Sequence, residues 1–345
     1  MPAVSIIIAA YRAEKHIESS VRSALDQTFS DLEVVVVDDG SDDATAAIVR
    51  SIDDSRVKLI QQANRGQSAA LNTGVANSTG SYIKFLDADD QLNDTHIASQ
   101  MEAIANETDK LASCRWCYFV EAPPAAMPPL EHTSRNIDDP VQWIVESLTL
   151  DDGMMGGWMW LIPRDVLNRA GGWDERLSLN NDFDFSIRLL LSSSGVRFAS
   201  NAVYYYRKGL DAAVTSLRSN AAMTSAFLTT ELGCNALLAR ENSERTREVC
   251  ADRWQQWAYL LYPGSPDLAN RAIRNSEDLG GSDEQMRGGK LLHVLLPIVG
   301  WKAVRRLQTF AYSSGWRAIL GWKEQRRIAQ IRDANAEVRN RERVS

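Results

Sequence analysis

The sequence predicts an α/β protein whose open, mostly parallel sheet is covered by helices on both faces, followed by a helical C-terminal extension. Two observations predict this fold class. Apolar runs of strand length alternate with segments of helical periodicity over roughly the first 208 residues, a pattern typical of parallel sheets with crossover helices. Beyond Thr215 the periodicity is helical. We therefore expect an α/β domain over residues 1–215 and a helical region over residues 216–345.

The elements of the α/β domain are expected in a definite order. Continuous apolar runs predict strands at 4–10, 32–37, 57–61 and 82–86, since strands of a parallel sheet are buried on both faces. Helical periodicity predicts intervening helices at 13–27, 44–51 and 68–76. Later elements are a strand-like run at 116–120, a proline-rich loop at 121–140, helices at 141–148 and 164–170, a strand at 158–162, a helix after Phe185, and strands at 196–199 and 202–206.

The segment Asp87-Ala88-Asp89-Asp90 places three carboxylates at the end of the fourth expected strand. Tyr11 and the pair Asp38-Asp39 also follow strands directly, and ligands of parallel sheets bind at these carboxyl ends. Close like charges raise one another's pKa unless a cation or water compensates. Oxygen ligands of this kind suit Mg²⁺ or Mn²⁺, which usually bridge protein carboxylates to a ligand's phosphates. The alternative is a solvated acidic turn, because short acidic motifs often arise by chance.

Other function classes lack support in the sequence. No G-x-G-x-x-G follows the first strand and no G-x-x-x-x-G-K-[ST] is present, which argues against dinucleotide oxidoreductases and P-loop nucleotidases. The four histidines are scattered, so a zinc site or serine triad is not expected. Residues 1–286 carry 25 Lys and Arg against 41 Asp and Glu. Nucleic acid is therefore not an expected partner, because it requires a basic footprint.

Seven motifs occur in order along the chain: Val4 to Tyr11, Gln27-Thr28-Phe29, Val34 to Ser41, Asn64-Arg65-Gly66, Phe85 to Asp90, Gly172 to Glu175, and Asn181-Asp182. Together, over about residues 3–208, they resemble family 2 glycosyltransferases of the GT-A fold. The resemblance implies an inverting, metal-dependent transferase that uses a nucleotide-diphosphate sugar, with a UDP-hexose as the expected donor. The Gln-x-x-Arg-Trp motif of processive synthases is absent. We therefore expect transfer of a single sugar to a hydroxyl of a glycan or lipid-linked glycan acceptor, in polysaccharide or exopolysaccharide synthesis.

The resemblance also implies roles for individual residues. Asp182 corresponds to the catalytic base that takes a proton from the acceptor hydroxyl, although a helix cap is the structural alternative. Asp89 corresponds to the ligand of a divalent cation, Mn²⁺ or Mg²⁺. The positions that correspond to nucleotide contacts are Ala9, Tyr11, Glu14, Asp39, Asn64, Asp87 and Ala88.

Three tryptophans, Trp158, Trp160 and Trp173, are candidate acceptor contacts. Sugars stack on aromatic faces, but burial in the core explains such residues as well. Trp158 and Trp160 are expected on one face of the same strand, since side chains alternate along strands. Both would therefore point inward or both outward.

The chain departs from the family pattern at three positions. Asn181 replaces a Glu that often precedes the base, and Leu71 stands where relatives often have an Arg that contacts the diphosphate. Lys208-Gly209 replaces a segment in which relatives often carry a metal-binding His. Lys208, Arg207 and Arg65 are candidates for the missing positive charge. A catalytically weak nucleotide-sugar-binding protein therefore stays open as an alternative.

The C-terminal segment differs in charge from the rest of the chain. Residues 287–345 carry 13 Lys and Arg against 4 Asp and Glu, and the tract 291–301 is apolar. This composition suits a helix on an anionic membrane surface; the alternatives are packing within the protein, a homodimer contact, or a scaffold acting through this tail. The four cysteines, at 114, 117, 234 and 250, are too few for a disulfide framework. We therefore expect a cytoplasmic protein, peripheral on the inner face of the plasma membrane if the tail binds lipid.

Overall fold

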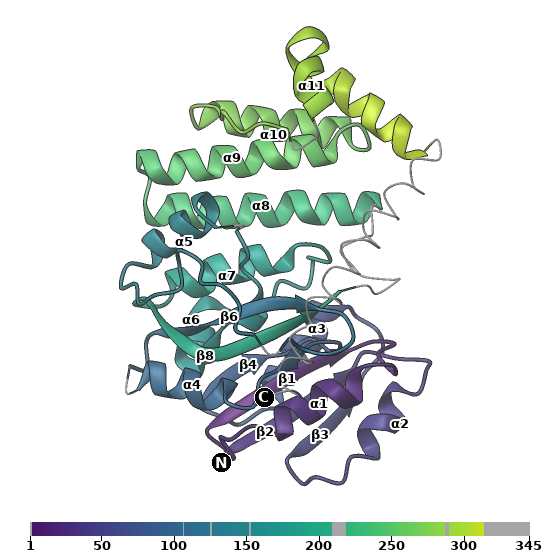
Figure 1. The fold of residues 1–345 in the computed structure, drawn as a ribbon, viewed down its shortest axis with the longest axis vertical. Coiled ribbons are helices and arrows are strands. Elements are labelled where there is room, and N and C mark those ends of the chain that lie inside the picture. The colour runs from purple at the N-terminus through teal and green to yellow at the C-terminus, as the bar shows by residue number, and fades with distance from the viewer. Residues whose placement is uncertain are drawn as a thin grey trace, which may run out of the picture. The chain divides into compact units, whose positions relative to one another are not determined.

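The computed structural model describes residues 2–313 except 106, 125, 152, 209–218 and 287–289. These residues form two compact units, an α/β unit up to residue 208 and a helical unit from residue 219 (Figure 1). The two units are described separately below.

Within the described residues, the α/β unit holds an eight-stranded sheet in the order β3-β2-β1-β4-β7-β6-β8-β5. Strands β1 to β4 pair in parallel, whereas β7 runs antiparallel to both β4 and β6. The mostly parallel α/β class predicted from the alternating pattern is confirmed. The strand bounds are β1 Val4–Ala10, β2 Leu32–Asp38, β3 Val57–Gln61, β4 Tyr82–Phe85, β5 Gln91–Leu92, β6 Leu111–Phe119, β7 Leu161–Pro163 and β8 Val196–Arg207.

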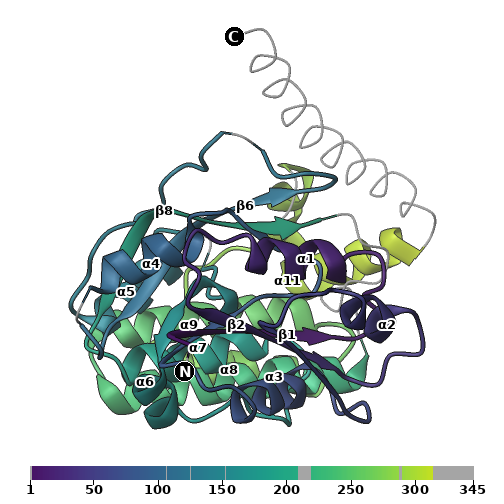
Figure 2. The same cartoon turned by 90° about the horizontal axis from the view of Figure 1, so that it is seen from below.

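Helices cover both faces of this sheet, and α1 and α3 lie on opposite sides of β1 and β2 (Figure 2). Gly74 allows the close approach of α3, because a Cβ at this position would lie 2.3 Å from Ile7 Cγ2. Within the described part of the unit the helices are α1 Ile17–Leu25, α2 Thr45–Arg50, α3 Gln67–Ala76, α4 His96–Ile104, α5 Pro140–Thr149, α6 Arg164–Ala170 and α7 Asn181–Leu191, with the 3₁₀ turn η1 at Gly157–Met159.

The helical unit consists of α8 Asn220–Arg240, α9 Glu244–Leu261, α10 Pro266–Asp278 and α11 Lys290–Ser313. Ser243 and Thr246 form a capping box at the start of α9, which satisfies backbone N–H groups that have no partner within the helix. Phe227 of α8 packs on Trp254 of α9, with ring centres 4.9 Å apart. No helix in the described residues is both long enough and apolar enough to span a bilayer.

Two expected elements are wrong in detail. The strand expected at 158–162 is a 3₁₀ turn followed by the shorter β7, so Trp158 and Trp160 do not share a strand. The strands expected at 196–199 and 202–206 form one strand, β8, because β6 pairs with both parts. The pairing register shifts between Cys114 and Arg115, so β8 accommodates extra residues without ending.

Lys84 is a fully buried lysine in the middle of β4. Its ammonium group donates a 2.6 Å hydrogen bond to the carbonyl oxygen of Trp158 and lies 5.8 Å from the centre of the Tyr204 ring. Burial disfavours the charged form and lowers the pKa of Lys84 to about 8. The strand that carries the acidic segment therefore contains a polar anchor to η1.

We predict that Lys84→Met changes the free energy of unfolding in a pH-dependent way. Since folding lowers the pKa of Lys84 from 10.5 to about 8, the unfolded chain binds more protons between these values. Wild-type stability therefore rises with pH across this window, and a methionine of similar length lacks the gain of about 2 kcal/mol. Urea unfolding near pH 7.5 and pH 10 measures this difference, with the exposed Lys58→Met as control. If wild type and Lys84→Met differ in free energy of unfolding by the same amount at both pH values, the lowered pKa of Lys84 is contradicted.

Candidate active site

The carboxyl ends of β1, β2 and β4 lie side by side in the parallel sheet. Ala10 pairs with Asp38, and Ile7 pairs with Phe85. The backbone N–H of Leu86 continues the ladder by donating to the carbonyl oxygen of Ile7 at 3.0 Å. The sheet therefore delivers the acidic segment 87–90 to the same edge as the residues that follow β1 and β2.

Asp90, the third carboxylate of this segment, has a structural role. Its side chain is buried and accepts hydrogen bonds from the Tyr204 hydroxyl at 2.8 Å and the Arg207 backbone N–H at 2.6 Å. The Arg207 guanidinium donates to the carbonyl oxygen of Asp89 at 2.6 Å, and the Asp87 N–H donates to the Tyr204 hydroxyl at 3.2 Å. The end of β8 thus fixes the acidic segment and leaves two carboxylates for a ligand.

Those two carboxylates, Asp87 and Asp89, are partly exposed. Burial raises the pKa of both groups, and repulsion from Asp89 and Asp182 raises the pKa of Asp87 further. The Asp87 carboxylate accepts a long hydrogen bond, 3.3 Å, from Gln67. Among the described residues neither carboxylate forms an ion pair.

The carboxylates of Asp87 and Asp89 fit a divalent cation that a bound phosphate also coordinates. No group of three or more His, Cys, Asp or Glu side chains within the described ranges could hold a metal ion by itself. Mg²⁺ sites commonly use one or two carboxylates, with water and substrate phosphates completing the shell. A cation at Asp87 and Asp89 would also remove the repulsion that raises the pKa of Asp87.

Asp182 lies in the first turn of α7. Its Oδ1 atom accepts a 2.7 Å hydrogen bond from the Gly157 backbone N–H, and burial raises the pKa of its carboxyl group. Gly157 has no room for a side chain, because a Cβ would lie 2.4 Å from the Trp173 ring. The turn η1 therefore orients Asp182 through backbone that comes very close to the aspartate.

An aromatic cluster brings Asp182 towards the acidic segment. Phe85 packs edge-on against Phe185 at 5.7 Å and against Trp173 at 5.4 Å, and Trp173 stacks on Phe185 at 3.9 Å. Phe85 and Asp87 lie two residues apart on β4 and its extension, and Asp182 and Phe185 lie three apart on α7, so each pair shares a face. Packing of the phenylalanines therefore places the two aspartates close enough to repel each other.

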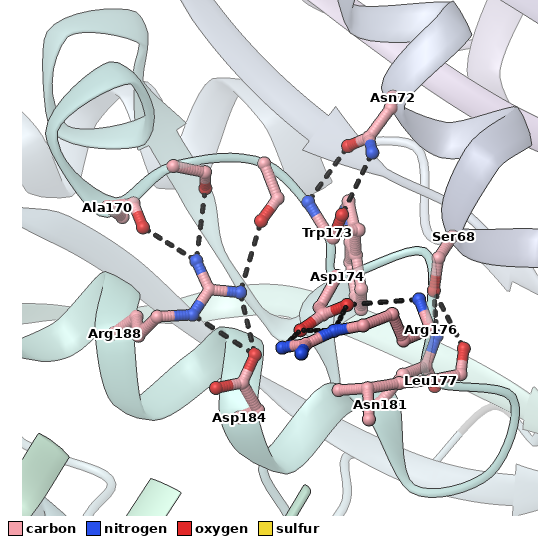
Figure 3. Close-up of polar contacts among 12 residues, drawn as sticks. Ser68, Asn72, Ala170, Trp173, Asp174, Arg176, Leu177, Asn181, Asp184 and Arg188 are labelled. Carbon is pink, nitrogen blue, oxygen red and sulfur yellow. Dashed lines mark hydrogen bonds and ion pairs between the residues drawn. The ribbon is translucent and has the colours of Figure 1, made fainter. Parts of the chain in front are cut away.

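Hydrogen bonds hold the segment between α6 and α7 in place (Figure 3). Arg188 forms an ion pair with Asp184 at 2.7 Å and donates to the carbonyl oxygens of Ala170 and Gly172. Asn72 of α3 bonds both the N–H and the carbonyl oxygen of Trp173. This network positions the start of α7, and Asp184 supports it as a structural residue.

The structure describes two of the three positions at which the sequence departs from the family pattern, Asn181 and Leu71. Asn181 donates to the Ser68 hydroxyl at 3.1 Å, which ties α7 to α3 (Figure 3). Leu71 is buried in the core and provides no charge. Gly209 lies outside the described residues. Of the proposed substitutes, Arg65 pairs with Glu175 at 2.7 Å.

The expected nucleotide contacts lie on neighbouring loops. Tyr11 is 47% exposed at the end of β1, directly after Ala9 and Ala10. The Glu14 carboxylate accepts from the Ala44 N–H at 3.1 Å, so it caps α2. Asp39 is buried and accepts from the backbone N–H groups of Arg65 and Gly66. It thereby orders the loop that carries the exposed Asn64, which packs against Gly40 at positive φ.

The three tryptophans lie in the core, which favours the packing alternative over acceptor contact. Trp160 is fully buried and its indole N–H donates to Ser186 at 3.3 Å. Trp158 stacks on Tyr204 at 4.2 Å, and Trp173 stacks on Phe185. Each is 5% exposed or less. Trp160 is therefore a core residue, and Trp158 and Trp173 pack beside the site and help to position it.

Sequence reasoning missed several residues that shape this site. Tyr204 and Gly157 bond directly to Asp90 and Asp182. Tyr206 lies near enough to Asp87, Asp89, Asp90 and Asp182 for their charges, together with burial, to raise the pKa of its phenol. Alternation along β8 could have placed Tyr204 and Tyr206 on one face. No sequence pattern indicates that this face meets the acidic segment.

Known proteins are similar to this chain in sequence and in fold. The family described as glycosyl transferase family 2 matches residues 5–169. The uncharacterized glycosyltransferase EpsJ of Bacillus subtilis is 28% identical over 214 residues, which cover 60% of this chain and 62% of EpsJ. The Escherichia coli glucosyltransferase WfaP is 38% identical over 122 residues, covering 35% of this chain and 48% of WfaP. The chain thus spans about three fifths of EpsJ and about half of WfaP.

A solved structure shares the fold. Residues 1–349 of S. aureus TarS in complex with UDP-GlcNAc give a TM-score of 0.66 at 17% identity, covering 81% of each chain. A complex of the same protein with UDP gives a TM-score of 0.59. The GT-A fold expected from the motifs is thereby confirmed, together with helices that follow it. Residues 5–169 therefore form a glycosyltransferase family 2 domain, and the α/β unit that contains them has the GT-A fold.

Proposed function

We propose that this chain transfers a single sugar from a nucleotide-diphosphate sugar to an acceptor hydroxyl, with inversion at the anomeric carbon. The proposed nucleotide is UDP. The observation that carries the proposal is the convergence of Asp182, in the first turn of α7, with Asp87 and Asp89 of the acidic segment, where burial and repulsion raise the pKa of Asp87. TarS was solved with UDP and with UDP-GlcNAc, and the name of WfaP gives UDP-Glc as its donor. These neighbours support UDP as the nucleotide.

Asp182 acts as the general base in this proposal. The acceptor oxygen attacks the anomeric carbon, the bond from this carbon to the diphosphate oxygen breaks with its electron pair, and the hydroxyl proton passes to the Asp182 carboxylate. A positioned base of this kind typically contributes about 10²- to 10⁴-fold. Burial raises the pKa of Asp182, which makes the carboxylate a stronger base once it is ionised.

Asp89, with Asp87 beside it, would hold Mn²⁺ or Mg²⁺ together with the donor diphosphate. Such a cation neutralises negative charge on the leaving group. The exposed Tyr11 and the loop ordered by Asp39 are the proposed nucleobase contacts, and Ala88 faces the ribose. Fixed in this way, the donor presents its anomeric carbon towards Asp182.

The acceptor is proposed to be a glycan or a lipid-linked glycan used in polysaccharide assembly. Support comes from WfaP, whose name gives a sugar-diphosphoundecaprenol as acceptor. The alternative hypothesis, that the chain binds a nucleotide sugar without catalytic turnover, makes a different prediction. It predicts donor binding at the same residues without sugar release or transfer.

We predict that Asp182→Asn lowers kcat at least 100-fold while UDP binding stays within about twofold, because only the base is lost. Donor turnover and calorimetric UDP titration in Mn²⁺ measure the two quantities. In wild type, kcat should fall as the pH drops through the raised pKa of Asp182, since the protonated carboxyl cannot accept a proton.

The matched control is Asp165→Asn, an exposed aspartate in the first turn of α6. This change removes a similar interaction with a helix N-terminus and should leave kcat unchanged. Equal losses in both variants would indicate helix capping rather than base catalysis. Wild-type UDP binding without turnover on any acceptor would favour the binding-protein rival.

We further predict that Asp89→Asn and Asp90→Asn fail in different ways. Asp89→Asn should weaken Mn²⁺-dependent UDP binding at least tenfold, because a charged ligand is lost. Asp90→Asn should lower the free energy of unfolding by about 1–3 kcal/mol, because it disturbs the buried bonds to Tyr204 and Arg207. Thermal shift with UDP, in Mn²⁺ and in EDTA, separates the effects, with the exposed Asp94→Asn as control. UDP affinity that is the same in EDTA and in Mn²⁺ would refute the metal role.

A further inference from the structure

Helix α11 carries an exposed apolar surface on the helical unit. Its two halves meet at Gly300, whose φ of 73° interrupts the helix. In the second half Trp301, Val304 and Arg305 face inward: Trp301 packs on Tyr259 and Tyr262, Val304 is fully buried, and Arg305 donates to the Tyr262 carbonyl oxygen at 3.2 Å. The spacing of these residues is that of one helical face.

The opposite face is apolar and exposed. On this face Leu307 is 54% exposed and Phe310 is 70% exposed. Ile298 and Val299, in the separate helical segment before Gly300, are 73% and 46% exposed. We call these four residues the α11 patch. Large side chains held outward by an anchored helix indicate a binding surface more strongly than single scattered residues do.

The charged side chains that α11 itself places beside the α11 patch are basic. Lys302 and Arg306 are exposed next to it, and their side chains lie over the aromatic rings of Trp301 and Tyr262 at 5.6 and 5.5 Å. The whole sequence from Arg287 to Lys323 contains no Asp or Glu. A partner with an apolar interior and an anionic rim complements this surface.

We infer that the α11 patch binds the surface of an anionic phospholipid bilayer. Its apolar side chains enter the boundary between headgroups and acyl chains, while Lys302 and Arg306 contact lipid phosphates. This is the arrangement of an interfacial amphipathic helix, and anionic lipid attracts basic side chains near the surface. The inference does not depend on the proposed transferase activity, because it rests on the helical unit alone. The basic residues Arg317, Lys323, Arg326 and Arg327 and the tryptophans Trp316 and Trp322 lie outside the described residues.

Vesicle flotation of the full chain tests this inference. Wild type should float with vesicles of phosphatidylcholine containing about one third phosphatidylglycerol, and not with phosphatidylcholine alone. About 0.5 M salt should weaken the binding, since it screens exposed charges. Ile298→Ser/Leu307→Ser should lower the partition coefficient at least tenfold, and Lys302→Gln/Arg306→Gln roughly 30-fold.

Two variants serve as matched controls, with folding of all variants checked by circular dichroism. Leu260→Ser removes a side chain 50% exposed on α9, and Arg240→Gln/Arg274→Gln removes two exposed charges. Both should float like wild type. Failure of wild type to float, or equal losses in controls and patch variants, would overturn the inference. Sedimentation velocity adds a third result: a wild-type dimer that Ile298→Ser/Leu307→Ser converts to monomer, with flotation unchanged, would assign the patch to a second copy instead.

Discussion

Repulsion among carboxylates is the constraint on which the rest of this site depends. Asp87 and Asp89 follow β4, and Asp182 lies in the first turn of α7. Burial raises the pKa of all three carboxyl groups, and repulsion from Asp89 and Asp182 raises the pKa of Asp87 further. Such an arrangement costs free energy unless a cation shares the site. Contacts elsewhere in the fold hold the carboxylates in place. Tyr204 of β8 donates a hydrogen bond to Asp90 of the acidic segment, and the stacked rings of Trp173 and Phe185 position the start of α7.

The carboxylates of the acidic segment 87–90 have different roles. Tyr204 and Arg207 satisfy the Asp90 carboxylate, so Asp90 supports the structure of the acidic segment, and Asp87 and Asp89 are the two carboxylates of this segment proposed to face a ligand. Asn181 has a similar structural use through Ser68. Its replacement of the family's usual Glu therefore bears on the position of α7 more directly than on the chemistry of Asp182.

Local patterns predicted much of this fold, and tertiary contacts account for the rest. The apolar run of β1 and the helix α6 match the expected bounds. Helix α1 begins at Ile17 rather than at residue 13, because residues near Ala13 bond to Thr45 across the chain. The motifs predicted Asp182 and Asp89, but the roles of Tyr204 and of the buried Trp160 depend on which faces meet in space. A single sequence does not carry that information.

Anomalous diffraction from a crystal grown with UDP and Mn²⁺ tests the central claim most directly. The account predicts one manganese peak in contact with the Asp89 carboxylate and the UDP diphosphate, with Asp90 still bonded to Tyr204 and the Asp182 carboxylate facing the sugar side of the diphosphate. UDP bound on another face of the α/β unit would contradict it. So would UDP bound at this edge of the sheet without manganese.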